Sequence, residues 1–404
     1  MINYFYINNL YNLYSYRIDF NVNEADTDSY IKFITGPNGY GKTTILKIIN
    51  AILTNKLSKL FSISFDNLEI GIDNAVLKIQ QSDIVSDTKL SKDFDFSLVS
   101  KRLECSFLSS KESSSVSEFI LDEVREPLVE LLANEKQKVK LSGNKNEFDL
   151  FIDSRLGYFI SEKRVVDSMS SPLNDGTYTS SLKEFANDLK ILISVFRVKL
   201  PMLAFNLDGK VDVNSATKDE IEAYNIFNSL RAYDLIDISS IMSVSNDVSF
   251  IDIYRNNKMI IDECFGGVKY ILKKIQLFDN IISEANLANK DIQFSSKYGF
   301  RFKMRDKNNT ILTFNDLSSG EKHIVTQYYN MLFTAVTDKM VVLIDEPEIS
   351  FHMMWLTNYL NNIRKIVDLR KTQFIIATHS PDIFNSKWSL TYDLYEGNEC
   401  KEQY

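Results

Sequence analysis

The sequence predicts an α/β fold of the P-loop type, and three observations point to it. Residues 36–44 match the pattern G-x-x-x-x-G-K-[ST], an apolar run over residues 30–35 precedes them, and residues 45–53 are apolar at helical spacing. A strand, a glycine-rich loop and a helix in this order direct backbone N–H groups and a helix N-terminus at one anion. Two further apolar runs without alternation, 340–344 and 373–377, are typical of buried parallel strands.

The loop carries the residue types that bind a nucleoside triphosphate. Lys42 is placed to reach the β- and γ-phosphates, and the Thr43 hydroxyl is placed to take a position on Mg²⁺. We therefore predict ATP and Mg²⁺ as cofactors. The expected nucleotide-binding residues are Gly36, Pro37, Asn38, Gly39, Tyr40, Gly41, Lys42, Thr43 and Thr44.

Composition narrows the possible classes of protein. The chain has 404 residues, is 44% apolar and carries a net charge of −8, which favours a folded protein and disfavours nucleic-acid binding through bulk charge. It has no apolar run of membrane-spanning length and no secretory signal at its start, so we expect a cytoplasmic protein without membrane contact. The three cysteines are far apart and predict neither disulfides nor a zinc site.

Most other segments show the hydrophobic periodicity of a strand or of a helix. Residues 2–7, 14–20, 68–72 and 75–80 alternate and predict an antiparallel sheet, and 299–305 with 310–314 predicts a hairpin. We expect helices over residues 118–133, 182–198, 220–236, 258–289 and 353–369, and a return to strand over 148–160. Gly266 and Gly267 are expected to interrupt or bend the longest of these helices.

Two carboxylates follow the apolar run 340–344. Asp345 and Glu346 would lie at the C-terminal end of a parallel strand, where open α/β sheets place their ligands. Asp345 can hold Mg²⁺ through a water, and Glu346 can take a proton from the water that attacks the γ-phosphate. The three histidines, His323, His352 and His379, all lie in the last quarter of the chain, which indicates chemistry in this segment.

A second helix start precedes these carboxylates. Ser318 and Gly320 can form an anion-binding corner at a helix N-terminus. Alternatively, Ser318 and Glu321 form a capping box that only starts the helix. The sequence around them alone leaves both interpretations open.

Together these motifs resemble the ABC-type ATPases, in the branch that contains the SMC, RecF and OLD (overcoming lysogenisation defect) proteins. Residues 317–321 (LSSGE) resemble the ABC signature, 344–352 (IDEPEISFH) resemble Walker B and the D-loop, and 377–381 (ATHSP) resemble the switch-histidine segment. The resemblance implies an ATPase head formed by residues 1–80 and 295–404, with an insertion over 81–294 that is mixed at first and then mainly helical. It also implies a homo-oligomer, at least a head-to-tail dimer, in which Ser318 and Gly320 contact ATP held by the other copy.

The resemblance implies catalytic roles for Glu346, His379 and Lys42, with Thr43 and Asp345 on the metal. His352 stands where the D-loop usually has aspartate. The usual Q-loop glutamine is not evident, so Lys163, Gln80 and Gln81 remain candidates. Tyr14 and Tyr16 could stack on adenine, or they could be core residues.

Stand-alone heads of this kind resemble the ATPase subunits of bacterial anti-phage systems such as Septu and PARIS, which implies a separate effector partner such as a nuclease or toxin. The alternative is a RecF-like DNA-repair ATPase, with conditional DNA contact through the basic hairpin that carries Lys297, Arg301, Lys303, Arg305 and Lys307. A transporter subunit is disfavoured by the large middle insertion.

Overall fold

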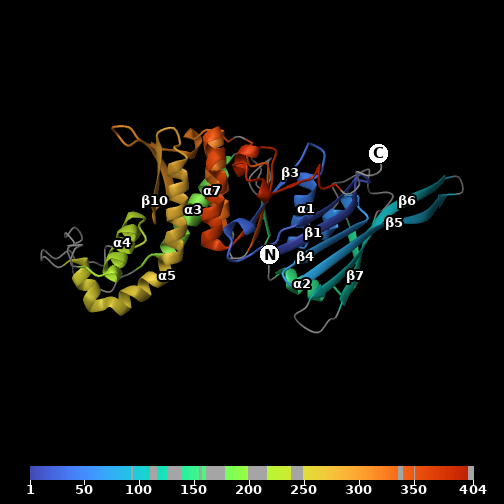
Figure 1. The fold of residues 1–404 in the computed structure, drawn as a ribbon, viewed down its shortest axis with the longest axis horizontal. Helices are drawn as coiled ribbons and strands as arrows, with labels where there is room; N and C mark the ends of the chain where they lie inside the picture. The colour runs from blue at the N-terminus through green and yellow to red at the C-terminus, as the bar shows by residue number, and fades with distance from the viewer. Residues whose placement is uncertain are drawn as a thin grey trace. The chain divides into compact units, whose positions relative to one another are not determined.

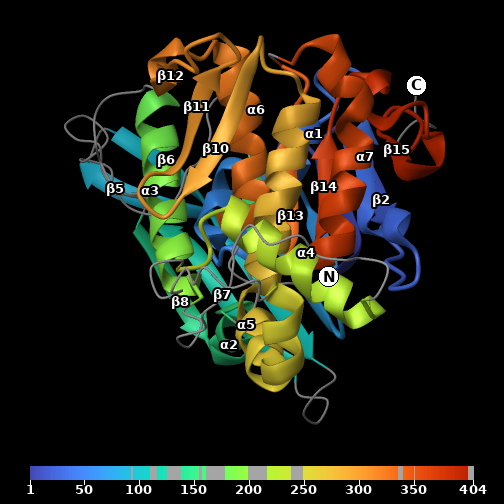
Figure 2. The same cartoon turned by 90° about the vertical axis from the view of Figure 1, so that its left-hand side faces the viewer.

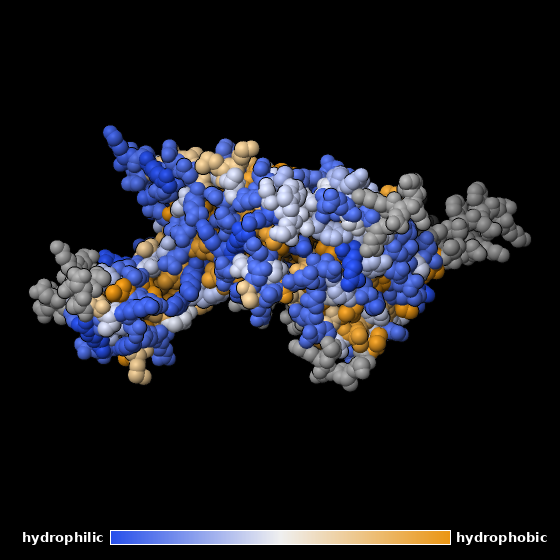
Figure 3. All heavy atoms as spheres, in the orientation of Figure 1, coloured by the Kyte–Doolittle hydropathy of each residue, from blue (hydrophilic) through white to orange (hydrophobic). Residues whose placement is uncertain are grey.

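The computed structural model describes residues 1–91, 94–109, 116–124, 138–153, 157–160, 178–198, 216–237, 249–334, 340–349 and 351–398. The chain forms two compact units. The first comprises residues 1–168, 335–349 and 356–404, and the second comprises residues 169–334 and 350–355. No helix among the described residues is long and apolar enough to cross a membrane, and the face drawn in Figure 3 is mainly hydrophilic.

The first unit contains a five-stranded parallel sheet. Its order is β15 (Thr391–Asp393), β3 (Ile31–Thr35), β14 (Gln373–Ala377), β13 (Val341–Asp345) and β9 (Gly157–Ile160). Every residue of β13 and β14 is buried, as expected for strands covered on both faces. Asp345 pairs with Ala377, and Ala377 pairs with Ile34, so the C-terminal ends of these three strands meet at one edge.

The same unit contains a seven-stranded antiparallel sheet, coloured blue to teal in Figure 1. Its strands alternate between a buried and a more exposed face, as in β4, where Leu68 and Ile70 are buried and Glu69 is half-buried. The order of the sheet is β2 (Tyr14–Asp19), β1 (Ile2–Leu10), β4 (Asn67–Ile72), β5 (Ala75–Ser91), β6 (Phe94–Ser109), β7 (Val116–Val124) and β8 (Lys138–Gly143).

Helix α1 (Lys42–Leu53) joins the two sheets of the first unit. Its Ile45, Ile48, Ile49 and Ile52 are fully buried in one hydrophobic core that also includes residues of the parallel and the antiparallel sheet. This unit also contains α2 (Asn146–Asp153), the 3₁₀ helices Thr27–Tyr30, Leu57–Ser62, Pro381–Phe384 and Trp388–Leu390, and α7 (Met353–Arg370) from Leu356 onwards.

The second unit is helical around a small antiparallel sheet. Gly299 has φ +70°, and a Cβ there would meet the Ala186 carbonyl oxygen at 1.7 Å, so only glycine allows α3 to approach the sheet this closely. Figure 2 shows α3 beside β11. The elements are α3 (Tyr178–Phe196), α4 (Lys218–Ala232), α5 (Phe250–Glu284), β10 (Lys290–Ser295), β11 (Gly299–Met304), β12 (Ile311–Leu312), η5 (Phe314–Asp316), α6 (Ser319–Tyr329) and the π-helical turn Asn330–Thr334.

The predicted α/β fold class is confirmed, but three local predictions are wrong. Residues 118–124 belong to strand β7, and the remainder of the helix predicted there lies outside the described residues. Residues 148–153 belong to helix α2. The Gly266–Gly267 pair does not interrupt α5, whose single non-helical residue is Asn257 (φ −131°, ψ 25°).

The first and the third of these differences have a physical reason in the structure. In β7, Phe119 and Leu121 are buried while Ile120 is half-exposed, so apolar residues on both faces imitate a helical period. In α5, the buried Phe265 and Val268 on either side of the glycines hold the helix against its neighbours. The Asn257 amide donates to the Ile253 carbonyl at 3.0 Å, which indicates a local competitor for the backbone at the kink.

Candidate nucleotide-binding site

The phosphate loop connects β3 to α1. The residue before the helix is Gly41, which has φ +89°, and no side chain caps the helix. The first-turn N–H groups are therefore left for a ligand. The Tyr16 hydroxyl donates to the Tyr40 carbonyl at 2.8 Å and holds the loop from the β2 side. Pro37, Asn38 and Gly39 are exposed at the tip of the loop.

Lys42 is buried at the base of this loop, with 5% of its surface exposed. Its Nζ donates to the carbonyls of Gly36 at 2.8 Å and Pro37 at 3.0 Å, and it lies 3.3 Å from His379 Nδ1. Burial lowers the pKa of the Lys42 ammonium below its usual value, while the carboxylates of Glu346 and Asp345 oppose that shift. The cation is thus anchored between the loop and the end of β14.

Two oxygen donors meet beside the loop. The Thr43 hydroxyl donates to Asp345 Oδ1 at 3.1 Å, and Asp345 is 4% exposed at the end of β13. Hydroxyl and carboxylate oxygens are ligands that Mg²⁺ accepts, and Mg²⁺ usually takes few protein ligands together with phosphates and water. In the described part of the chain, no cluster of three or more His, Cys, Asp or Glu side chains could hold a metal ion without phosphate and water ligands. The donor set fits Mg²⁺ brought in with a nucleotide.

Glu346 and His379 face each other at the same edge. Glu346 Oε1 lies 2.9 Å from His379 Nε2, and their side chains are 20% and 33% exposed. Glu346 has φ +46°, a left-handed conformation that is uncommon for a residue other than glycine, and its N–H donates to the Ala377 carbonyl at 2.9 Å. Such an outlier at the end of a buried strand is typical of functional sites.

The five side chains with predicted chemistry therefore converge in the first unit. Lys42 contacts His379, His379 contacts Glu346, and Thr43 contacts Asp345. Thr44 is at the outer side of the loop, where its hydroxyl is 3.3 Å from that of Tyr11. The arrangement can bind a triphosphate, hold a metal through oxygen atoms, and present a carboxylate to a water molecule.

The second helix start lies in the second unit. Ser318 is exposed and caps α6: its Oγ accepts from the Glu321 N–H at 3.3 Å, and its N–H donates to Glu321 Oε2 at 2.7 Å. Glu321 is 4% exposed and accepts from Lys290 Nζ at 2.7 and 2.9 Å. Burial alone would raise the pKa of Glu321, but the bonds from Lys290 and Ser318 bring it below its usual value. The capping box is present, and the Ser318 side chain remains accessible.

Only one of the three clustered histidines belongs to the site in the first unit. His323 is buried, its ring lies edge-on to Phe351 at 5.3 Å, and burial lowers its pKa to about 4. His352 Nδ1 accepts from the Met354 N–H at 3.3 Å at the start of α7. Both therefore have structural contacts in the second unit.

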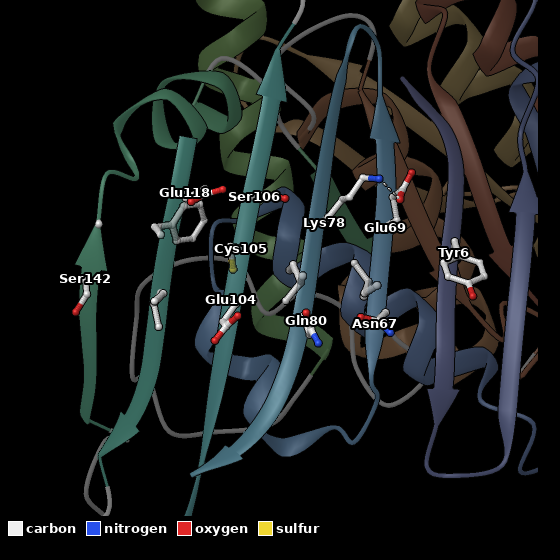
Figure 4. A pocket seen from close by; sticks show the side chains of 15 residues that line it. Tyr6, Asn67, Glu69, Lys78, Gln80, Glu104, Cys105, Ser106, Glu118 and Ser142 are labelled. Carbon is white, nitrogen blue, oxygen red and sulfur yellow. Dashed lines mark ion pairs between the residues drawn. The ribbon is translucent and has the colours of Figure 1, made fainter. Parts of the chain in front are cut away.

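The three candidates for the Q-loop position lie in different parts of the chain. Lys163 lies outside the described residues. The Gln81 amide donates to the Ile63 carbonyl at 3.0 Å and so holds the chain that leads into β4. Gln80 lines a cavity of about 770 Å³ on one face of the antiparallel sheet, together with residues such as Glu69, Lys78 and Glu104 (Figure 4). Neither glutamine is shown in contact with Lys42, Asp345 or Glu346.

The two tyrosines considered for stacking on adenine differ in their burial. Tyr16 is fully buried and is a core residue, while Tyr14 is half-buried with its ring 5.1 Å from that of Tyr40. Tyr11 was missed by sequence reasoning; it is 42% exposed and contacts Thr44. Tyr11 has φ +56° in the turn between two strands, so no hydrophobic period in the sequence marks it. Glu348 was also missed, although it accepts hydrogen bonds from the Thr378 hydroxyl and the His379 N–H.

Comparison with known proteins identifies the family. Residues 1–384 match the family model described as AAA ATPase domain (AAA_15), so the chain belongs to this family. The match confirms the ATPase part of the resemblance. None of the curated proteins compared with the chain matches it.

Solved structures of SMC heads are similar to the chain. The Pyrococcus furiosus Smc head domain with an extended coiled coil, bound to the C-terminal domain of ScpA, is 13% identical with a TM-score of 0.41 over 95% of this chain and 90% of that chain. An SmcHead bound to the C-winged helix domain of ScpA is 12% identical with a TM-score of 0.38 over 95% and 90%. The Thermotoga maritima SMC head domain is 12% identical with a TM-score of 0.35 over 97% and 94%. These likenesses concern the fold alone.

Proposed function

We propose that this member of the AAA ATPase domain family binds ATP with Mg²⁺ and hydrolyses it, and that ATP drives two heads together. The observation that carries the proposal is the convergence of Lys42, Thr43, Asp345, Glu346 and His379 at one edge of the parallel sheet. Family membership supports the nucleotide class.

Each side chain has a distinct task. Lys42 and the first-turn N–H groups of α1 bind the phosphates, and Thr43 and Asp345 hold Mg²⁺, which supplies neutralisation of phosphate charge when bound. Glu346 orients the attacking water and takes its proton. His379, within reach of Lys42 and Glu346, senses the γ-phosphate and keeps the carboxylate oriented.

The accessible corner at α6 supports the proposed head association. Ser318 is exposed, and Gly320 is half-buried beside it. We propose that Ser318 and Gly320 contact the γ-phosphate held by a second copy, so that ATP joins two copies and hydrolysis releases them. This switch would control a separate effector protein, such as a nuclease or toxin in anti-phage defence.

The test is a comparison of Glu346→Gln with wild type. The variant keeps a hydrogen-bonding side chain but loses the base, so we expect ATP turnover to fall by about 10²- to 10⁴-fold while ATP binding persists. Mass photometry should show an ATP-dependent dimer that accumulates in the variant. Glu184→Gln, on the exposed side of α3, is the control and should behave like wild type. Unchanged turnover in Glu346→Gln would refute the assignment of the base.

A second function, DNA clamping, is favoured by one observation. Lys297 and Lys307 are exposed on the β10–β12 sheet, although Arg305 is paired with Asp291 at 2.6 Å and Arg301 stacks on Tyr298 at 4.2 Å. Duplex retention that requires ATP, falls with salt and is lost in the double variant Lys297→Glu/Lys307→Glu would support it. Retention that is unaffected by these substitutions would exclude this surface as the DNA contact.

A further inference from the structure

Glu348 lies in the turn that follows β13, two residues beyond Glu346. Its Oε1 accepts two hydrogen bonds, from the Thr378 hydroxyl at 2.7 Å and from the His379 main-chain N–H at 2.8 Å. Both donors belong to the segment that follows β14. One carboxylate oxygen therefore fastens the loop that carries the proposed base to the loop that carries the proposed switch histidine.

The donors are themselves held firmly. Thr378 is fully buried, its N–H donates to the Ile34 carbonyl at 3.1 Å, and its hydroxyl oxygen accepts from the Ser380 N–H at 3.0 Å. The Glu346 N–H reaches the Ala377 carbonyl at 2.9 Å. The His379 main-chain N–H donates to Glu348, so Glu348 contributes directly to the position of that main chain beyond the end of β14.

The position of the main chain decides what the His379 ring can do. Lys42 Nζ has only protons to donate, so His379 Nδ1, 3.3 Å away, accepts. A neutral ring then carries its proton on Nε2, which donates to Glu346 Oε1 at 2.9 Å. The imidazole thus bridges the phosphate-loop cation and the carboxylate in a single tautomer, and a displaced main chain would break both contacts.

The second oxygen of Glu348 supports a role beyond local folding. Oε2 is buried and has no hydrogen-bond partner among the described residues. A buried oxygen without a hydrogen-bond partner is energetically unfavourable, and a purely structural side chain would be expected to avoid that cost. Glu348 also contributes to the negative surroundings of Lys42.

We propose that Glu348 is a positioning residue, which fixes the main chain at His379 so that its ring joins Lys42 to Glu346. The proposal rests on the proposed ATPase function for its kinetic consequence, but its geometric part can be measured without turnover.

The geometric test uses the small number of histidines. In full-length protein with ¹⁵N-labelled histidine, long-range ¹H–¹⁵N spectra contain three imidazoles, and the His379 signals are those missing from His379→Gln. We expect Glu348→Ala to bring the Nδ1 and Nε2 shifts of His379 together through tautomer exchange, with His323 and His352 unchanged. Glu348→Gln retains the acceptor oxygen and should retain two separate shifts. His379 signals in Glu348→Ala that superimpose on wild type would overturn the proposal.

The kinetic test separates positioning from folding. We expect Glu348→Ala to lower kcat by about 100-fold, the lower range for a lost acid–base arrangement, with ATP affinity within about threefold of wild type. Glu348→Gln should restore most of kcat. Thr378→Val, which removes one donor at nearly constant shape, should show a smaller loss and a smaller shift of the His379 signals, and it also serves if Glu348→Ala does not fold.

Three other results would also bear on the role of Glu348 or on the proposed function. Equal defects in Glu348→Gln and Glu348→Ala would show that charge, not the hydrogen-bond acceptor, matters, and would overturn the proposal. Loss of ATP binding together with kcat would do the same. Wild-type protein without any ATP turnover would refute the proposed function, while the His379 spectra would still decide the role of Glu348.

Discussion

The N-termini of α1 and α6 were both predicted to bind phosphate, yet they are built differently. At α1 the residue before the helix is Gly41, no side chain caps the helix, and Lys42 is buried beside it. At α6 Ser318 and Glu321 form a capping box, and Lys290 is ion-paired with Glu321. The first end leaves its N–H groups for a ligand, whereas the second is already stabilised by its own chain. Substitutions at α1 should therefore weaken ligand binding, and substitutions at α6 should first reduce stability.

The largest expected effect is at the α6 end. Lys290→Met leaves the buried Glu321 carboxylate without its cation, so the free energy of unfolding should fall by about 3–5 kcal/mol. Urea denaturation measures the change. Lys297→Met, an exposed lysine of the same hairpin, is the control and should stay within about 0.5 kcal/mol of wild type. A similarly small change in Lys290→Met would show that this end is not stabilised by the ion pair.

Acid should weaken the same unit through His323. Its folded pKa of about 4 lies below the unfolded value of about 6.5, so the unfolded chain binds the proton more readily between these values. The stability contributed by the neutral ring is present above pH ~6.5 and is lost as the pH falls towards ~4, by about 3 kcal/mol in total. His323→Leu should remove this part of the pH dependence of unfolding. Parallel pH profiles of the two proteins would contradict the assignment.

At the α1 end the effect should appear in binding. Lys42→Met removes the charge-assisted contacts to the phosphates, and we expect ATP affinity to fall about 100-fold. Stability should change by less than about 1 kcal/mol, because the ammonium is desolvated and burial already lowers its pKa. Lys47→Met, exposed on the same helix, is the control for titration calorimetry and thermal unfolding. A large loss of stability with unchanged ATP affinity would reverse the contrast between the two helix ends.

The two ends also show what the sequence could predict. The loop at residues 36–44, the buried strand β13 and the capping box at Ser318 are local patterns, and each was predictable from neighbouring residues. The ion pair between Lys290 and Glu321 and the bond from Thr378 to Glu348 join residues that are about 30 positions apart, so no local period signals them. Local patterns can also mislead. We predicted a helix over residues 118–124, where the protein has strand β7, because the apolar Ile120 on the outer face of the strand hides the alternation of buried and exposed residues.

The smallest expected effect separates the two roles left open for Ser318. Ser318→Ala removes the cap and should reduce stability by about 1 kcal/mol, whereas Ser318→Asp keeps a capping oxygen and should leave stability nearly unchanged. If Ser318 also contacts the γ-phosphate of a second copy, the aspartate places a negative charge against that phosphate, so ATP-dependent dimerisation should be lost in Ser318→Asp and only weakened in Ser318→Ala. Unfolding curves and mass photometry with ATP measure the two effects separately. If both variants dimerise like wild type, the serine serves only to cap α6, and the contrast between the helix ends becomes one between a binding site and a purely structural terminus.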